Sequence, residues 1–121
     1  MAAKKLKLVI EQGATFRKVL TWKTGTPPVP VDLTGFRGKM QVREELDSSV
    51  VLLNLTTENG GLIFGTTDGT MTMYIPASVT TTINWETAVY DFFVIIPAAP
   101  EPESRKLLYG PMVSKAEVTR A

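Results

Sequence analysis

Apolar and polar residues alternate along most of this chain with the period of two that is typical of β-strands. The clearest alternation runs from residue 36 to residue 43, and its length predicts an antiparallel strand with one face buried. The apolar or small side chains of this segment are Phe36, Gly38, Met40 and Val42, and the polar ones are Arg37, Lys39, Gln41 and Arg43.

Seven other segments have the composition of strands and are bounded by turn-forming residues. Residues 49–57 are apolar on both sides, which predicts a strand in the centre of a sheet or buried on both faces. The last segment is expected to bend or bulge near Gly110-Pro111. The seven segments are residues 6–10, 15–23, 49–57, 62–64, 70–75, 88–96 and 105–119.

Turn-forming residues separate these strands. Asp32 and Thr34 can bond neighbouring backbone N–H groups and Gly35 can take a positive φ, so this segment predicts a tight turn. Two pairs predict hairpins with type I′ turns, in which both central residues have a positive φ. These pairs are Asn59-Gly60 and Asp68-Gly69.

Prolines mark two further boundaries in the chain. Three prolines between residues 27 and 30 predict a stiff loop with no place in a sheet, because proline has a fixed φ and no N–H. Pro76 ends a strand, and the residues after it predict one short helical turn. With about eight strands, the sequence predicts an all-β protein, an antiparallel β-sandwich of immunoglobulin-like or Greek-key type.

One local motif supports the sandwich. An acidic residue, two small positions and then Tyr90 at a strand entrance are similar to the tyrosine corner of immunoglobulin-like sandwiches, where the hydroxyl bonds nearby backbone. Tyr90 is therefore expected to be structural. The length of 121 residues predicts a single domain, residues 1–121.

Composition limits the chemistry. The chain has no cysteine and no histidine, so thiolate nucleophiles, the commonest general base and the commonest zinc ligand are missing. No spacing of a nucleophile with a base, phosphate-binding loop or calcium loop is present. We expect a protein that is not an enzyme, with no catalytic residues, cofactor, metal or small-molecule substrate.

Charge and hydropathy limit the kinds of partner that the chain can bind. The chain has 13 Lys and Arg against 12 Asp and Glu. This near neutrality disfavours binding of nucleic acid or anionic lipid through the net charge of the whole chain. Too few apolar residues precede Glu11 for a signal peptide or a membrane span. We expect synthesis in a cytoplasm without export by a signal of its own.

The polar side of residues 36–43 is the one candidate surface. Its four residues, Arg37, Lys39, Gln41 and Arg43, allow three interpretations. They can form a solvated face of the sheet that keeps the protein soluble, or they can dock on an acidic partner. Nucleic-acid binding is the third interpretation, and the lack of interleaved aromatic residues on that side disfavours it.

The order of the segments resembles that of small structural proteins encoded by tailed bacteriophages. The likeness covers nearly the whole chain and is most specific at Gln12–Phe16, Val31–Gly35 and Ala88–Asp91. More distantly, the first half is similar to the amino-terminal module of phage baseplate upper proteins. The loop at Pro27–Pro30 is longer than in the usual pattern.

This resemblance implies a non-catalytic virion protein, an adaptor or attachment subunit in the tail, baseplate or fibre region. Two alternatives stay open: a capsid decoration protein, and a non-viral protein-binding β-sandwich. The implied partners are other virion proteins (tail, fibre or capsid subunits) in a symmetric, multi-copy assembly. The implied location is the virion, after synthesis in the host bacterial cytoplasm.

Overall fold

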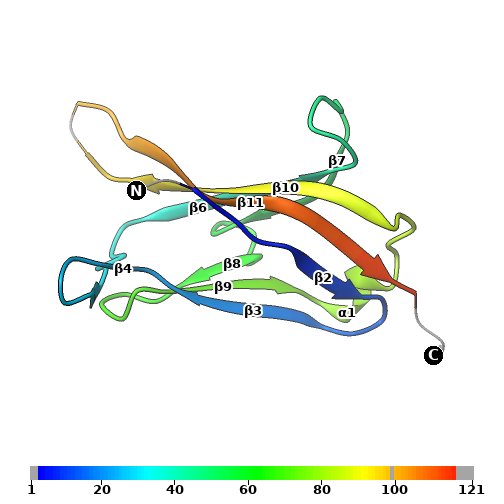
Figure 1. Ribbon diagram of the computed structural model, residues 1–121, viewed down its shortest axis with the longest axis horizontal. Helices are drawn as coiled ribbons and strands as arrows, with labels where there is room; N and C mark the ends of the chain where they lie inside the picture. Colours follow the sequence, from blue (N-terminus) through cyan, green and yellow to red (C-terminus); the bar gives the residue numbers. More distant parts are fainter. Residues whose placement is uncertain (1–2, 99, 117–121) are drawn as a thin grey trace.

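Two β-sheets packed face to face make up the fold (Figure 1). The structure is a computed structural model that describes residues 3–98 and 100–116. The large sheet contains β1 (Lys4–Lys5), β2 (Leu8–Glu11), β6 (Arg37–Arg43), β7 (Val51–Thr56), β10 (Thr87–Ile96) and β11 (Glu103–Lys115). The small sheet contains β3 (Phe16–Thr21), β8 (Leu62–Phe64) and β9 (Thr70–Ile75). The predicted all-β sandwich is confirmed.

Two minor elements complete the described residues. A two-stranded ribbon joins β4 (Lys23–Thr24) and β5 (Val29–Pro30), and α1 (Ala77–Thr80) is the predicted short helical turn. The ribbon contradicts the expectation that the proline loop takes no part in pairing, because Pro30 lies opposite Lys23. Both strands of so small a ribbon are edges, where the missing N–H of a proline is tolerated.

The large sheet is mixed rather than fully antiparallel. Its order is β1-β11-β10-β6-β7, and β2 continues along the same edge of β11 as β1. The pairs β10–β11, β10–β6 and β6–β7 are antiparallel, whereas β1 and β2 run parallel to β11. Parallel neighbours need a long connection, and here most of the chain supplies it. Counting β1 and β2 as one strand and leaving out the ribbon, the described residues form the predicted eight strands.

The prediction for residues 49–57 is wrong, because β7 is an edge strand. Leu55 is buried, but Leu52 and Leu53 are only partly buried and Val51 is exposed. The register of β6 and β7 shifts between Val42 and Arg43. This irregularity interrupts the alternation and explains why apolar residues fall on both sides of the segment.

The inward faces of the two sheets form the core. The alternation predicted for residues 36–43 is confirmed, since Gly38, Met40 and Val42 are buried and Lys39 is exposed. A side chain at Gly38 would meet the ring of Phe64 at 2.6 Å, so glycine lets the two sheets approach closely there. The buried apolar residues are Leu8, Ile10, Trp22, Leu33, Met40, Val42, Leu55, Leu62, Met71, Met73, Ile75, Ile83, Ala88, Tyr90, Phe92, Val94, Leu107 and Met112.

The two Asx-Gly turns differ in outcome. Asn59-Gly60 does not form the predicted hairpin, because it connects β7 of the large sheet to β8 of the small sheet, whereas Asp68-Gly69 does lie in the hairpin of β8 and β9. Among the described residues only glycines have a positive φ, so neither Asn59 nor Asp68 adopts the type I′ conformation. Asn59 instead acts through its side chain, whose Oδ1 accepts bonds from the N–H groups of Thr56 (2.9 Å) and Gly61 (2.8 Å). Gly60 and Gly69 do have positive φ values, of 82° and 70°.

Two aspartates hold their turns by bonding a threonine two residues on. Asp32 accepts bonds from the N–H (3.0 Å) and hydroxyl (2.6 Å) of Thr34, as predicted, and Gly35 has a φ of 81°. Asp68 accepts equivalent bonds from Thr70, at 3.2 Å and 2.9 Å. These bonds lower the pKa of both carboxyl groups, because they favour the charged form.

Tyr90 links β10 to the segment between β1 and β2. Its hydroxyl donates a 2.6 Å bond to the carbonyl of Leu6, 84 residues away, in the segment between β1 and β2. The expected bond to nearby backbone is therefore wrong. Burial raises the pKa of Tyr90 to about 12. The cross-strand neighbour of Tyr90 is Gly110, where a Cβ would lie 2.6 Å from the Leu6 carbonyl oxygen.

The irregularity expected in the last strand lies earlier than predicted. Phe92 pairs with Leu108 and Phe93 with Lys106, so Leu107 has no partner and forms the bulge. Gly110 and Pro111 pair in regular register with β10. A bulge twists and bends a sheet, and this one lies beside the candidate site.

Candidate functional site

The outward face of the large sheet carries the candidate site. Along β10 the side chains at 88, 90, 92 and 94 point into the core, and alternation turns the intervening ones outward. These outward residues are Val89, Asp91, Phe93 and Ile95, and all four are half-buried although no other layer of the sandwich covers them.

The register places polar and charged residues on both sides of this row. Phe93 lies between Lys39 of β6 and Lys106 of β11. One step along β10, Asp91 lies between Gln41 and Tyr109. The pairing of three strands therefore brings together side chains that are far apart in the sequence.

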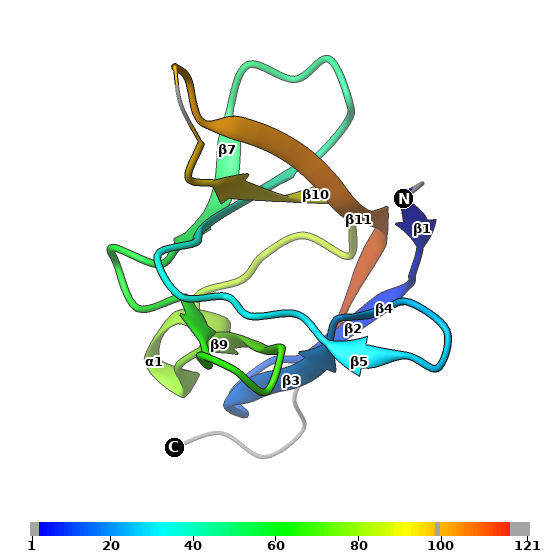
Figure 2. The same cartoon turned by 90° about the vertical axis from the view of Figure 1, so that its left-hand side faces the viewer.

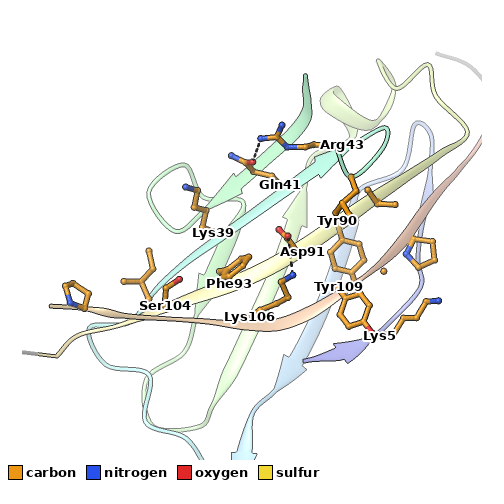
Figure 3. Close-up of a pocket in the computed structure, with 16 residues that line it drawn as sticks. Lys5, Lys39, Gln41, Arg43, Tyr90, Asp91, Phe93, Ser104, Lys106 and Tyr109 are labelled. Atoms are coloured by element: carbon orange, nitrogen blue, oxygen red, sulfur yellow. Dashed lines mark hydrogen bonds and ion pairs between the residues drawn. The ribbon is translucent and has the colours of Figure 1, made fainter. Parts of the chain in front are cut away.

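A groove of about 960 Å³ follows this face (Figure 3). Leu46, from the loop between β6 and β7, lies in its lining, as does Pro102, near the start of β11. Both of these connections rise from the outward side of the sheet, at opposite ends (Figure 1). The lining residues are Lys5, Lys39, Gln41, Arg43, Leu46, Val89, Tyr90, Asp91, Phe93, Ile95, Pro102, Ser104, Lys106, Tyr109, Gly110 and Pro111.

The groove is positively charged within a nearly neutral chain. Its lining has four cations and one acid, which leaves nine cations and eleven acids in the rest of the sequence. The acid, Asp91, lies 3.8 Å from the Lys106 ammonium group. This ammonium group also lies 5.5 Å from the centre of the Phe93 ring. Lys5 and Lys39 make no ion pair with any described residue.

The four residues predicted as a docking face have different roles. Lys39 and Gln41 line the groove, but Arg37 does not and forms a long, exposed ion pair of 3.9 Å with Glu58. Arg43 lines the groove, and its guanidinium group donates to Gln41 Oε1 at 2.9 Å and to the Ser48 carbonyl at 2.5 Å. Arg43 therefore fixes the loop after β6, which sequence reasoning missed.

Sequence reasoning also missed the residues that other strands contribute. Lys5, Phe93, Lys106 and Tyr109 come from β1, β10 and β11. One signal was present in the sequence. Residues 88–96 are mostly apolar at successive positions, whereas a strand in a sheet with one face open to water usually alternates apolar and polar residues. The aromatic residues absent from β6 lie on β10, which is next to it, and on β11, the strand beyond β10.

The lining is suited to binding. Apolar side chains form most of the floor, cations lie along both sides, and the carboxylate of Asp91 is engaged with Lys106. Within residues 3–98 and 100–116, no three acidic side chains gather closely enough to hold a metal ion. These features fit contact with an apolar surface that carries negative charge.

No protein-family model matches this sequence, and no curated protein is significantly similar to it. The described part of the chain contains no helix with the length and apolar character needed to cross a bilayer.

Proposed function

We propose that this chain is a non-catalytic structural protein of a tailed-bacteriophage virion, and that it binds another virion subunit through the groove. One observation carries the proposal: an apolar, positively charged groove follows the outward face of the large sheet. Contiguous apolar patches on a protein surface mark interaction sites more often than chance. The complementary charge of a partner would give that contact its register.

Within the virion, the favoured role is that of an adaptor or attachment subunit in the tail, baseplate or fibre region. The likeness of the first half to the amino-terminal module of baseplate upper proteins supports this role. The rigid sandwich supports it as well, because a preorganised surface loses little entropy on binding. A capsid decoration protein has the same requirements, and copy number separates the two roles: tens of copies per particle or fewer indicate the tail, and hundreds indicate the head.

Particle incorporation tests the proposal. The variant Lys39→Glu with Phe93→Ser changes the groove at two positions outside the core, so it should fold and yet be lost from particles. The control is Lys18→Glu with Val19→Ser on β3, where both side chains are exposed; it should be incorporated like the parent. Equal incorporation of both variants would contradict the groove's role. Absence of the parent chain from purified particles would contradict the virion assignment and favour the non-viral binding module.

A further inference from the structure

The loop between β6 and β7, residues 44–50, carries the charge opposite to that of the groove. Glu44, Glu45 and Asp47 are exposed, and none of them forms an ion pair with a described residue. Between them Leu46 is 87% exposed, and Val50 is 62% exposed. The loop therefore presents three acids around apolar side chains that its own chain does not bury.

This loop stands on the same side of the sheet as the groove. Figure 2 shows it rising beyond β10, away from the small sheet. The bond from Arg43 to the Ser48 carbonyl fixes its base, and Leu46 is part of the groove lining. The chain thus carries an acidic, apolar projection beside a basic, apolar depression on one face.

We propose that the groove binds the 44–50 loop of a second copy of this chain. This inference rests on the proposed function only in taking the groove as a protein-binding surface. Two copies would pack with the outward faces of their large sheets together and with their strands running in opposite directions. The two-fold axis that relates them would lie between the sheets, perpendicular to the strands. Each loop then enters the partner's groove, which makes the contact isologous and closed. The three acids of each loop meet a lining in which cations exceed acids by three.

The alternative arrangement and the alternative ligand both place like charges together. If the strands of the two copies ran in the same direction, both acidic loops would lie at the same end of the complex. A nucleic acid in the groove would bring phosphates near the same three acids and near Asp91 in the floor. The aliphatic floor at Val89 and Ile95 also suits an apolar side chain such as Leu46 better than a phosphate backbone. Like charges opposed at an interface select against these complexes.

Charge reversal on each side of the contact tests the proposal. The groove variant is Lys5→Glu with Lys39→Glu, and the loop variant is Glu44→Lys with Asp47→Lys. All four side chains are exposed and have no hydrogen bond or ion pair with described residues, so both variants should fold. The control is Lys18→Glu with Lys23→Glu, which changes net charge like the groove variant but lies on β3 and β4.

The measurement is sedimentation equilibrium of the purified proteins, with circular dichroism to verify folding. The parent and the control should reach twice the 13.3 kDa mass of one chain, and each reversal variant alone should stay at that mass. An equimolar mixture of the two variants should recover the double mass, because both contacts are then complementary again. The Leu46→Asp variant should be monomeric.

A monomeric parent would overturn the inference, and so would reversal variants that dimerise like the parent or a mixture that stays monomeric. Binding of a single-stranded oligonucleotide to the parent, lost in the groove variant, would identify the other ligand class and also overturn it. If the parent is monomeric but the groove variant is lost from particles, this inference fails and the proposed function stands. If the parent dimerises but is absent from particles, this inference stands and the proposed function fails.

Discussion

The two faces of β10 carry similar side chains in different surroundings. Phe92 points inward, is 0% exposed, and its ring centre lies 6.2 Å from that of Phe64 on the other sheet. Phe93 points outward into the groove, where the ammonium group of Lys106 lies 5.5 Å from its ring centre. The sandwich needs an apolar residue at position 92 and has no such need at position 93. Apolar residues on the outward face are therefore the ones that indicate binding.

The two phenylalanines should differ most in stability. Phe92→Ala leaves a cavity between the sheets, so we expect the free energy of unfolding to fall by about 3–5 kcal/mol. Phe93→Ala removes a half-buried side chain, and we expect a loss of about 1 kcal/mol or less. Urea denaturation measures both. Equal losses would mean that the outward face is as much a part of the core as the inward one.

The inward face should also be sensitive at Gly110. An added Cβ would lie 2.6 Å from the Leu6 carbonyl oxygen, at a φ of 151°, so Gly110→Ala should destabilise the fold by about 1–3 kcal/mol. Gly60 is the control, because its φ is 82° and nothing lies within 4 Å of an added Cβ. Gly60→Ala reports backbone strain alone. A melt in which Gly60→Ala costs as much as Gly110→Ala would remove the close approach of Leu6 as a cause.

Tyr90, on the inward face of β10, should make the free energy of unfolding depend on pH in alkaline solution. Tyr90→Phe leaves the Leu6 carbonyl without its partner, and we expect a loss of about 1–2 kcal/mol at neutral pH. The unfolded chain releases this proton near pH 10 and the native chain at about 12. Between these values the native state binds more protons, so stability falls as pH rises.

The stabilisation from a neutral Tyr90 is thus complete below pH 10 and lost as pH rises through about 12. Denaturation midpoints of the parent and the Phe variant should converge over this range. Parallel curves from pH 8 to 12 would show that the Tyr90 hydroxyl does not titrate differently on folding.

Substitutions of the outward cations should have the smallest effects on stability, and the effect should be larger for Arg43 than for Lys39. Arg43→Ala removes the bonds to Gln41 and to the Ser48 carbonyl, so we expect a loss of about 1 kcal/mol. The Lys39 side chain forms no hydrogen bond or ion pair with a described residue. Lys39→Ala should therefore change the free energy of unfolding by less than about 0.5 kcal/mol. Thermal melts measure both. Equal, negligible shifts would show that Arg43 does not fix the loop.

The sequence could predict the features that depend on neighbouring residues. Alternation located β6 and β9, and Asp32 with Gly35 located a turn, because each of these depends on a few adjacent side chains. The burial of residues 49–57 could not be predicted, since β7 owes its edge position to the order of strands in the sheet. A turn was predicted correctly at Asn59, but the hairpin was not, because this turn leads from β7 in the large sheet to β8 in the small one. The Asn59 side chain holds the turn through Thr56 and Gly61.

The candidate site was only partly predictable for the same reason. Lys39 was identified from a single strand, but Phe93 and Lys106 join it through the register of β6, β10 and β11. Arg37 and Lys39 look equivalent in the sequence, and yet one lies beyond the groove while the other lines it. Local pattern identifies the face of a strand, and pairing decides which part of that face forms a site.

The parallel pairing of β1 and β2 with β11 has a consequence for how the chain reaches its native state. These first strands have no other strand partner among the described residues, so residues 4–11 stay unpaired until every other strand of the fold has been made. Contacts of such high sequence separation slow folding, because the entropy of closing the loop is lost before they form. We expect the small sheet and the β6–β7 and β10–β11 hairpins to form first, and the first strands to dock last. Until then the edge of β11 is open to strands of other nascent chains, so folding yield should fall as the rate of synthesis rises.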